Sequence, residues 1–151
     1  MNGKKYIILE IIPTKVLGGD IAQLSALKLE GLELKDRFDY RLCEEKINIP
    51  DIIDMINYDK DNFKYVKRTS TIIRNFKKWI EDYDLLIIDN LYTENYLKDI
   101  KNKKESVFKY LNMEFSDNIM EKIMDKYSLV PSNHIVDLLY EAIIYENSKG
   151  E

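Results

Sequence analysis

The first half of the chain shows hydrophobic patterns that are typical of β-strands. Residues 6–12 form a nearly continuous run of bulky apolar side chains, which predicts a strand buried on both faces of a sheet. Residues 21–29 and 32–42 partly alternate between apolar and polar positions and predict two further strands. Between them, Glu30 and Gly31 predict a two-residue turn, because glycine adopts positive φ without strain. We therefore expect three consecutive antiparallel strands.

The second half of the chain shows mainly helical periodicity. Apolar side chains in residues 69–82 recur at the spacing of one helix face, which predicts an amphipathic helix whose stripe includes Phe76 and Trp79. The short apolar run 85–88 predicts another buried strand, and residues 106–112 are also predicted as a strand. The same kind of signal predicts the remaining helices over residues 50–56, 91–100, 117–127 and 133–147.

This order of elements predicts an α/β domain. Three strands followed by alternating helices and strands form a mixed sheet with helices packed on its faces. A chain of 151 residues is long enough to bury one hydrophobic core, and no repeat or Gly/Ser-rich linker divides it. We therefore expect a single domain over residues 1–151.

Composition narrows the classes of protein that the chain can belong to. The only cysteine is Cys43, which excludes an intrachain disulfide and a zinc cluster built on several thiolates. No run approaches the roughly 18 apolar residues of a membrane helix, so no membrane partner is expected. The N-terminus lacks the apolar core of a signal peptide, and we expect a cytoplasmic protein.

Positive charge is concentrated in two segments although the net charge is −4. Residues 60–78 carry seven basic residues against one acid, and residues 98–109 carry five against two. Phe63 and Tyr65 are interleaved with the first group, where aromatic rings can stack on single-stranded bases. The alternative is a solvated helix face followed by a lysine-rich loop. The candidate nucleic-acid-binding residues are Thr14, Lys67, Arg68, Arg74, Lys103 and Lys104.

Three titratable residues are candidates for catalytic chemistry. Glu10 ends the first strand, where a carboxylate can hold a divalent cation, although Mg²⁺ needs further oxygen ligands. Glu94 falls in the helix after strand 85–88, where acids often line the crevice of an α/β sheet. His134 is the only histidine, and its ordinary pKa near neutrality suits a general base. The structural alternatives are a solvated strand end, an exposed helix residue and a capping or packed ring.

Taken in chain order, these segments resemble the DEDDh 3′→5′ exonuclease family. The segment "LEIIPTKVL" stands where family members have "FDIETTGL", "DNLYTENYL" resembles "HNxxFDxxFL", and "HIVDLLYEA" resembles "HxAxxDA". The resemblance covers essentially the whole chain. It implies an RNase H-like exonuclease fold, in which three antiparallel strands are followed by parallel additions and the mixed central sheet is flanked by helices.

The resemblance also assigns positions in the active site. Glu10 and Glu94 stand at the first and third metal-binding acids of the family, and His134 stands at the general base. Ile12 stands at the second acid and Leu139 at the last one, so both of these acids are lost. An ion without those two carboxylates binds weakly, since apolar side chains do not replace its hydration. The resemblance therefore implies a degenerate site with no cofactor, or with weakly held Mg²⁺ or Mn²⁺.

Two functions stay open, together with a third and weaker interpretation in which the resemblance is accidental and the chain is another α/β binding domain. The first is a catalytically degenerate exonuclease-fold protein that serves as a regulatory domain and binds single-stranded nucleic acid or a protein partner, such as a nuclease or polymerase. The second is a divergent Mg²⁺- or Mn²⁺-dependent 3′→5′ exonuclease on single-stranded DNA or RNA, with Asp89 as an additional ligand. Asp137 is a poor substitute for the last acid, because it lies about 200° around the helix axis from Leu139.

Overall fold

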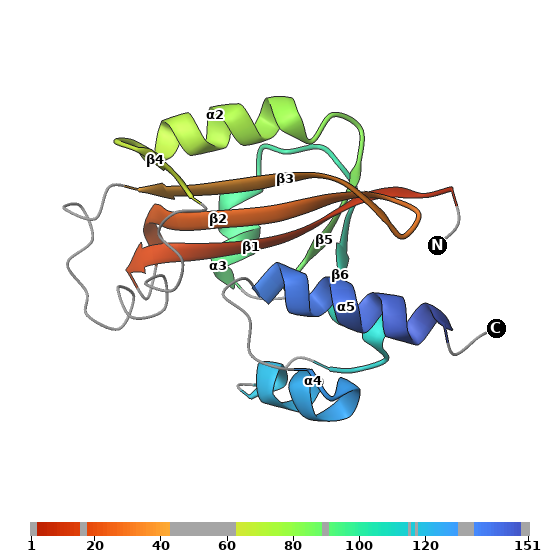
Figure 1. The fold of residues 1–151 in the computed structure, drawn as a ribbon. Coiled ribbons are helices and arrows are strands. Elements are labelled where there is room, and N and C mark those ends of the chain that lie inside the picture. The colour runs from red at the N-terminus through yellow and green to blue at the C-terminus, as the bar shows by residue number, and fades with distance from the viewer. Residues whose placement is uncertain are drawn as a thin grey trace.

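The computed structural model describes residues 3–15, 18–42, 63–88, 91–114, 116, 118–129 and 135–148. Six strands form one mixed sheet in the order β4-β3-β2-β1-β5-β6 (Figure 1). Consecutive strands β1, β2 and β3 are antiparallel, β5 and β6 are added to β1 in parallel, and β4 runs parallel to β3. This arrangement confirms the predicted mixed α/β sheet. The strands are β1 (Lys5–Lys15), β2 (Gly18–Glu30), β3 (Glu33–Leu42), β4 (Lys64–Val66), β5 (Asp84–Ile87) and β6 (Lys104–Ser106).

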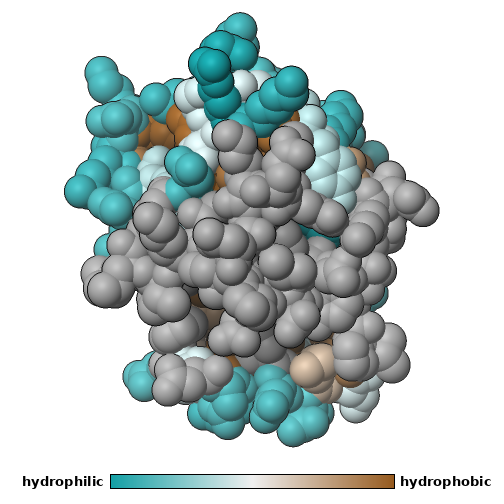
Figure 2. All heavy atoms as spheres, turned by 90° about the vertical axis from the view of Figure 1, so that its left-hand side faces the viewer, coloured by the Kyte–Doolittle hydropathy of each residue, from teal (hydrophilic) through white to brown (hydrophobic). Residues whose placement is uncertain are grey.

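Helices cover both faces of the sheet (Figure 1). We call the side with α2 and α3 the α2 face, and the side with α4, α5 and the 3-10 helix η3 the α5 face. None of the helices in the described ranges has the length and apolar character needed to cross a membrane. Seen from the end at which β1 finishes, hydrophilic side chains lie over the upper and lower parts of the molecule (Figure 2). The helices are α2 (Thr69–Trp79), α3 (Leu91–Tyr96), η3 (Val107–Leu111), α4 (Ile119–Tyr127) and α5 (Ile135–Ser148).

Strand β1 lies between two hydrophobic clusters. Ile7 and Leu9 belong to the cluster on the α2 face, whereas Tyr6 and Ile8 belong to the cluster on the α5 face. Successive side chains of a strand point to opposite faces, so a central strand covered on both sides needs apolar residues at every position. This requirement explains the continuous apolar run in the sequence.

Three predicted details need correction or lie outside the described residues. The strand predicted over 106–112 is wrong, because β6 ends at Ser106 and η3 follows. Val107 and Phe108 are both buried in the α5-face cluster, and strand alternation would turn one of these neighbours away from it. The turn residues are Gly31 and Leu32, one position later than predicted, although Gly31 has the expected positive φ of 61°. The helix predicted over 50–56 falls outside the described residues.

Candidate functional site

The second half of β1 carries the two positions at which the exonuclease resemblance places its first acids. Because side chains alternate along a strand, Glu10 and Ile12 point to the α5 face, like Ile8. Each of the two side chains is only 5% exposed. Glu10 is therefore a buried carboxyl group and not a solvated strand end.

Glu10 belongs to a chain of polar side chains that crosses three strands. Gln23 on β2 donates from Nε2 to Glu10 Oε1 at 3.4 Å, and Gln23 Oε1 accepts a hydrogen bond from Arg41 Nε on β3 at 2.9 Å. Gln23 and Arg41 are each 2% exposed. Burial raises the pKa of Glu10 from 4.5 to about 7, and the hydrogen bond from Gln23 acts in the opposite direction. Glu10 therefore titrates near neutral pH.

Arg41 places a fixed positive charge in this buried network. Its guanidinium carbon lies 3.8 Å from the centroid of the Phe63 ring, a cation–π contact, and its Nη2 has no hydrogen-bond partner among the described residues. Phe63 is thus occupied by the arginine and is 6% exposed, so it does not present a stacking surface to a base. Tyr65, the other interleaved aromatic residue, is 39% exposed.

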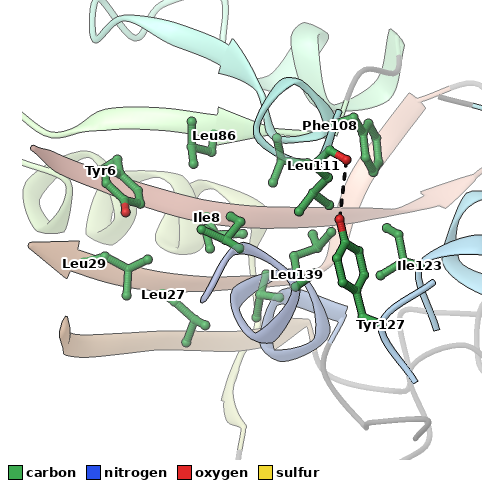
Figure 3. Packing of buried hydrophobic residues seen from close by; sticks show 14 of the residues in the cluster. Tyr6, Ile8, Leu27, Leu29, Leu86, Phe108, Leu111, Ile123, Tyr127 and Leu139 are labelled. Atoms are coloured by element: carbon green, nitrogen blue, oxygen red, sulfur yellow. Dashed lines mark hydrogen bonds between the residues drawn. The ribbon is translucent and has the colours of Figure 1, made fainter. Parts of the chain in front are cut away.

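The position at which the exonuclease resemblance places its last acid lies in a hydrophobic cluster. Leu139 on α5 is fully buried and shares this cluster with Ile8 and Leu27 from the sheet. Figure 3 shows Leu139 on the inner side of α5, close to the strands that carry these two residues. A carboxylate at this position would lose its hydration without gaining a described polar partner.

Asp137 is already engaged by an arginine. Arg37 Nη1 and Nη2 on β3 donate to Asp137 Oδ1 and Oδ2 at 2.8 and 3.0 Å, which is a bidentate ion pair. The carboxylate raises the pKa of the Arg37 guanidinium above its ordinary value. Asp137 therefore ties α5 to β3, and its oxygens would have to leave Arg37 before they could hold a metal ion.

The remaining candidates for chemistry are less well defined. Glu94 is exposed on α3, a helix that contacts β1. His134 and Asp89 lie outside the described residues, so their roles stay predictions. Of Thr14, the structure describes the backbone in β1 but not the side chain.

The described residues do not fit a two-metal centre. Within the described ranges, no group of three or more His, Cys, Asp or Glu side chains comes close enough together to hold a metal ion. Next to Ile12, the α5 face offers the carboxyl group of Glu10 and the amide of Gln23, and this amide also accepts a hydrogen bond from the guanidinium of Arg41. Mg²⁺ requires near-octahedral oxygen coordination, and a neighbouring fixed cation opposes its binding.

Exposed basic side chains gather along β4 and α2. Lys67, Arg68 and Arg74 are exposed, as are Lys77 and Lys78, and α2 contains no acid. None of these five side chains forms an ion pair with another described residue. Hydrophilic side chains accordingly crowd the upper part of the view in Figure 2, at the level of α2 and β4. We call these five residues the basic surface.

Lys103 and Lys104 do not belong to the basic surface. They lie where β6 begins, at the edge of the sheet where β1 also begins, whereas Lys67 and Arg68 follow β4 at the edge where β1 ends. Lys103 forms an ion pair with Glu105 at 3.0 Å, and Lys104 donates to the backbone carbonyl of residue 102 at 3.2 Å. The predicted nucleic-acid-binding residues are therefore split between two edges.

A pocket that the sequence did not reveal lies between β3 and α2. Its volume is about 510 Å³, and aromatic rings from both elements line it. Phe38 and Tyr40 are two residues apart on β3 and so face the same side, with ring centroids 4.5 Å apart; the centroid of Trp79 lies 5.3 Å from that of Phe38. In the sequence, only the two-residue spacing of Phe38 and Tyr40 indicated that two aromatic rings share one face of β3. We call this cavity the α2–β3 pocket; its other lining residues are Asp36, Arg37, Asp39, Lys64, Asn75 and Lys78.

Comparisons with known proteins show the fold. No protein-family model and no curated protein sequence matches the chain. Solved structures of exonuclease I are similar to it: an inhibitor complex (TM-score 0.62, 7% identity), a product-bound form (0.60, 9%) and an ExoI/SSB-Ct complex (0.59, 8%). These alignments cover 100%, 98% and 99% of this chain but 42%, 44% and 42% of those proteins, so the chain spans less than half of their length. The chain thus has an exonuclease-like, RNase H-like fold.

Proposed function

We propose that the chain is a catalytically inactive, exonuclease-fold domain that binds single-stranded nucleic acid. The observation that carries this proposal is the basic surface of β4 and α2, where five exposed cations have no ion-pair partner among the described residues. The net charge of the chain is −4, so this surface is a local concentration of positive charge and not part of a generally basic protein. Such a local surface attracts a flexible polyanion through its phosphates.

The side chains on the α5 face that could hold metal ions support the proposal that the chain does not hydrolyse nucleic acid. In the exonuclease resemblance, Ile12 and Leu139 stand at two of the four acid positions, and both side chains are buried. The carboxyl group of Glu10 is joined to Gln23, which in turn accepts a hydrogen bond from the buried Arg41. Two-metal hydrolysis needs ions held about 3.5–4 Å apart by several carboxylates, and these neighbours do not supply them.

The alternative function is a divergent exonuclease that uses Glu10 and Glu94. Glu10 is a buried carboxyl group on the α5 face, whereas Glu94 is exposed on α3, on the α2 face of the sheet. These two acids are the ones that the family resemblance would retain. A metal-dependent activity would have to recruit ligands from outside the described residues.

Salt dependence tests the binding proposal. We expect a fluorescent single-stranded oligonucleotide of about 12 nucleotides to bind the full chain, with log K falling linearly against log salt by about 0.7 per phosphate contacted. Replacing Lys67, Arg68 and Arg74 together by glutamine should reduce this slope by about 2, because three phosphate contacts are lost.

A matched variant controls for net charge. Lys98, Lys101 and Lys109 are exposed in the segments before and after β6, and their joint replacement by glutamine removes the same charge. This variant should keep the original slope. Equal losses in both triple variants, or no saturable binding at low salt, would contradict the proposal; the second result would point to a protein partner.

A further inference from the structure

We propose that the α2–β3 pocket holds one nucleotide, with its base against the rings of Tyr40 and Trp79 and its phosphate on Lys64 and Lys78. The inference rests on the proposed function, since it names the place where a bound strand inserts a base. It puts this contact beside α2, on the opposite side of the sheet from the buried network of Glu10. A nucleotide within a strand and a free nucleotide both consist of a planar base joined to an anionic phosphate, and the pocket would recognise these two groups.

The aromatic wall of the pocket is held in position before any ligand binds. Trp79 Nε1 donates to Asp36 Oδ2 at 2.8 Å, and Lys28 Nζ lies 4.6 Å from the centroid of the Trp79 ring. Phe38 packs between the two other rings of the wall, at 4.5 Å from Tyr40 and 5.3 Å from Trp79. Stacking on a fixed ring requires little ordering of the protein, which favours binding.

The charges that line the pocket favour an anionic ligand. Asp36 accepts hydrogen bonds from Trp79 and from the backbone N–H of Arg37, and Asp39 accepts from Arg37 Nε at 3.1 Å. Both acids are thus engaged within the protein. Lys64 and Lys78 are exposed and form no ion pair with the described residues, although Lys64 Nζ lies 5.7 Å from the Tyr40 ring.

The position and size of the pocket also fit a nucleotide. Lys78 belongs to both the pocket and the basic surface. The phosphates of a strand that follows α2 would therefore stay close to basic side chains until the strand reaches the pocket. The volume of about 510 Å³ lies in the range of roughly 300–1,000 Å³ that small-molecule sites occupy.

A peptide strand added to the free edge of β3 is the competing occupant, and the edge itself opposes it. Strand β4 pairs only with the last three residues of β3, so Glu33–Asp39 has no strand neighbour on that side among the described residues. This stretch carries Glu33, Lys35 and Arg37, and its register with β2 shifts at a bulge. Charged and bulged edges resist the addition of another strand.

The fluorescence of Trp79 tests the inference directly, because Trp79 is the only tryptophan in the chain. The full chain is titrated with oligothymidylate of about 12 nucleotides, while tryptophan emission and the anisotropy of a labelled copy are followed in parallel. We expect quenching and anisotropy to saturate at the same concentration. A mononucleotide in a separate arm shows whether the pocket also takes a free nucleotide; quenching there, too, supports the site.

Variants connect the signal to the named contacts. Lys64→Gln with Lys78→Gln should weaken oligonucleotide binding on the order of 10-fold at low salt and lower the salt slope by about 1.4. Tyr40→Leu should weaken it by about 10-fold through lost stacking, and Tyr40→Phe should keep the affinity. Lys98→Gln with Lys101→Gln is the charge-matched control and should bind like the wild type.

The possible failures are distinguishable. If anisotropy rises without quenching of Trp79, or if the pocket variants bind normally, the strand binds elsewhere: the inference is overturned and the proposed function stands. If anisotropy does not rise at all, both are overturned. An acidic peptide that quenches Trp79 and displaces the oligonucleotide would overturn the inference in favour of a peptide site.

Discussion

Glu10→Gln is expected to raise the free energy of unfolding by about 3 kcal/mol at pH values above 7. Burial raises the pKa of Glu10 from 4.5 to about 7, a shift of about 2.5 units, and each unit corresponds to about 1.4 kcal/mol. Glutamine has the same shape and keeps a carbonyl oxygen that can accept the hydrogen bond from Gln23. It removes the charge that the folded chain holds at high pH in a buried position.

The sign of this effect depends on pH. Between pH 4.5 and about 7, the folded chain keeps a proton on Glu10 that the unfolded chain has released. The contribution of Glu10 to stability is therefore fully present below pH 4.5 and is lost as the pH rises through about 7. Glu10→Gln should have the same free energy of unfolding as the wild type near pH 4.5. Its additional stability should grow as the pH rises to about 7 and stay constant above that pH.

Urea unfolding across this pH range measures the difference between the two proteins. Glu94→Gln removes one exposed carboxylate from α3 and is the matched control for the change in net charge. Parallel profiles for wild type and Glu10→Gln would show that Glu10 stays charged in the folded state and would contradict the described burial. A stabilisation of the wild type by millimolar Mn²⁺ that Glu10→Gln abolishes would instead reveal residual metal binding.

The second large effect is expected when an acid is placed at Leu139, where the exonuclease resemblance puts its last carboxylate. Leu139→Asp should lower the free energy of unfolding by about 5 kcal/mol, because it removes a fully buried leucine and places a carboxyl group in the apolar cluster. A domain of this size is stabilised by about 5–15 kcal/mol, so the variant should be close to unfolding. An acid at this one position should therefore damage the fold without producing nuclease activity.

Leu139→Asn separates the loss of packing from the introduction of charge. Both variants should be destabilised, but only the aspartate variant should lose further stability as the pH rises above the ordinary pKa of a carboxyl group. Thermal unfolding with and without Mn²⁺ completes the test. If Mn²⁺ rescues Leu139→Asp and not Leu139→Asn, the new carboxylate completes a metal site and the account of the α5 face is wrong.

The mixed sheet is predictable because its signal is local and repeated. The continuous apolar run predicts that β1 is buried on both faces, and partial alternation predicts strands β2 and β3. The apolar stripe through Phe76 indicates which side of α2 packs on the sheet. The prediction of a strand over residues 106–112 is wrong for a related reason. A short apolar run does not distinguish a strand from a tight helical turn, and in η3 the burial of two adjacent residues decides the outcome.

The surroundings of Glu10 depend on register, which the sequence does not reveal. Glu30 pairs with Glu33 at the turn, but a bulge between Lys28 and Leu29 shifts the later pairs by one residue, so Gln23 lies opposite Arg41. Without that bulge, Gln23 would lie opposite Tyr40, which in this structure points to the α2 face, and not opposite Arg41. The network that surrounds the candidate catalytic carboxyl group therefore follows from one irregular pair.

The α2–β3 pocket escapes sequence reasoning for a different reason. A tryptophan on the apolar stripe of a helix predicts burial, and the same pattern holds whether the ring is fully packed or lines a cavity. Trp79 is only partly buried, and among the described residues β4 pairs with no part of β3 before Tyr40. This short strand has too few residues to leave a pattern in the sequence.

A single reaction tests the central claim that the fold binds nucleic acid without cutting it. A 5′-labelled single strand of DNA or RNA is incubated with the full chain and Mn²⁺ at low salt, binding is followed by anisotropy, and the length of the label is followed on a gel. A bound strand that keeps its full length over a long time course is the predicted result. Shortening from the 3′ end that disappears in His134→Ala would contradict the account and establish a divergent exonuclease.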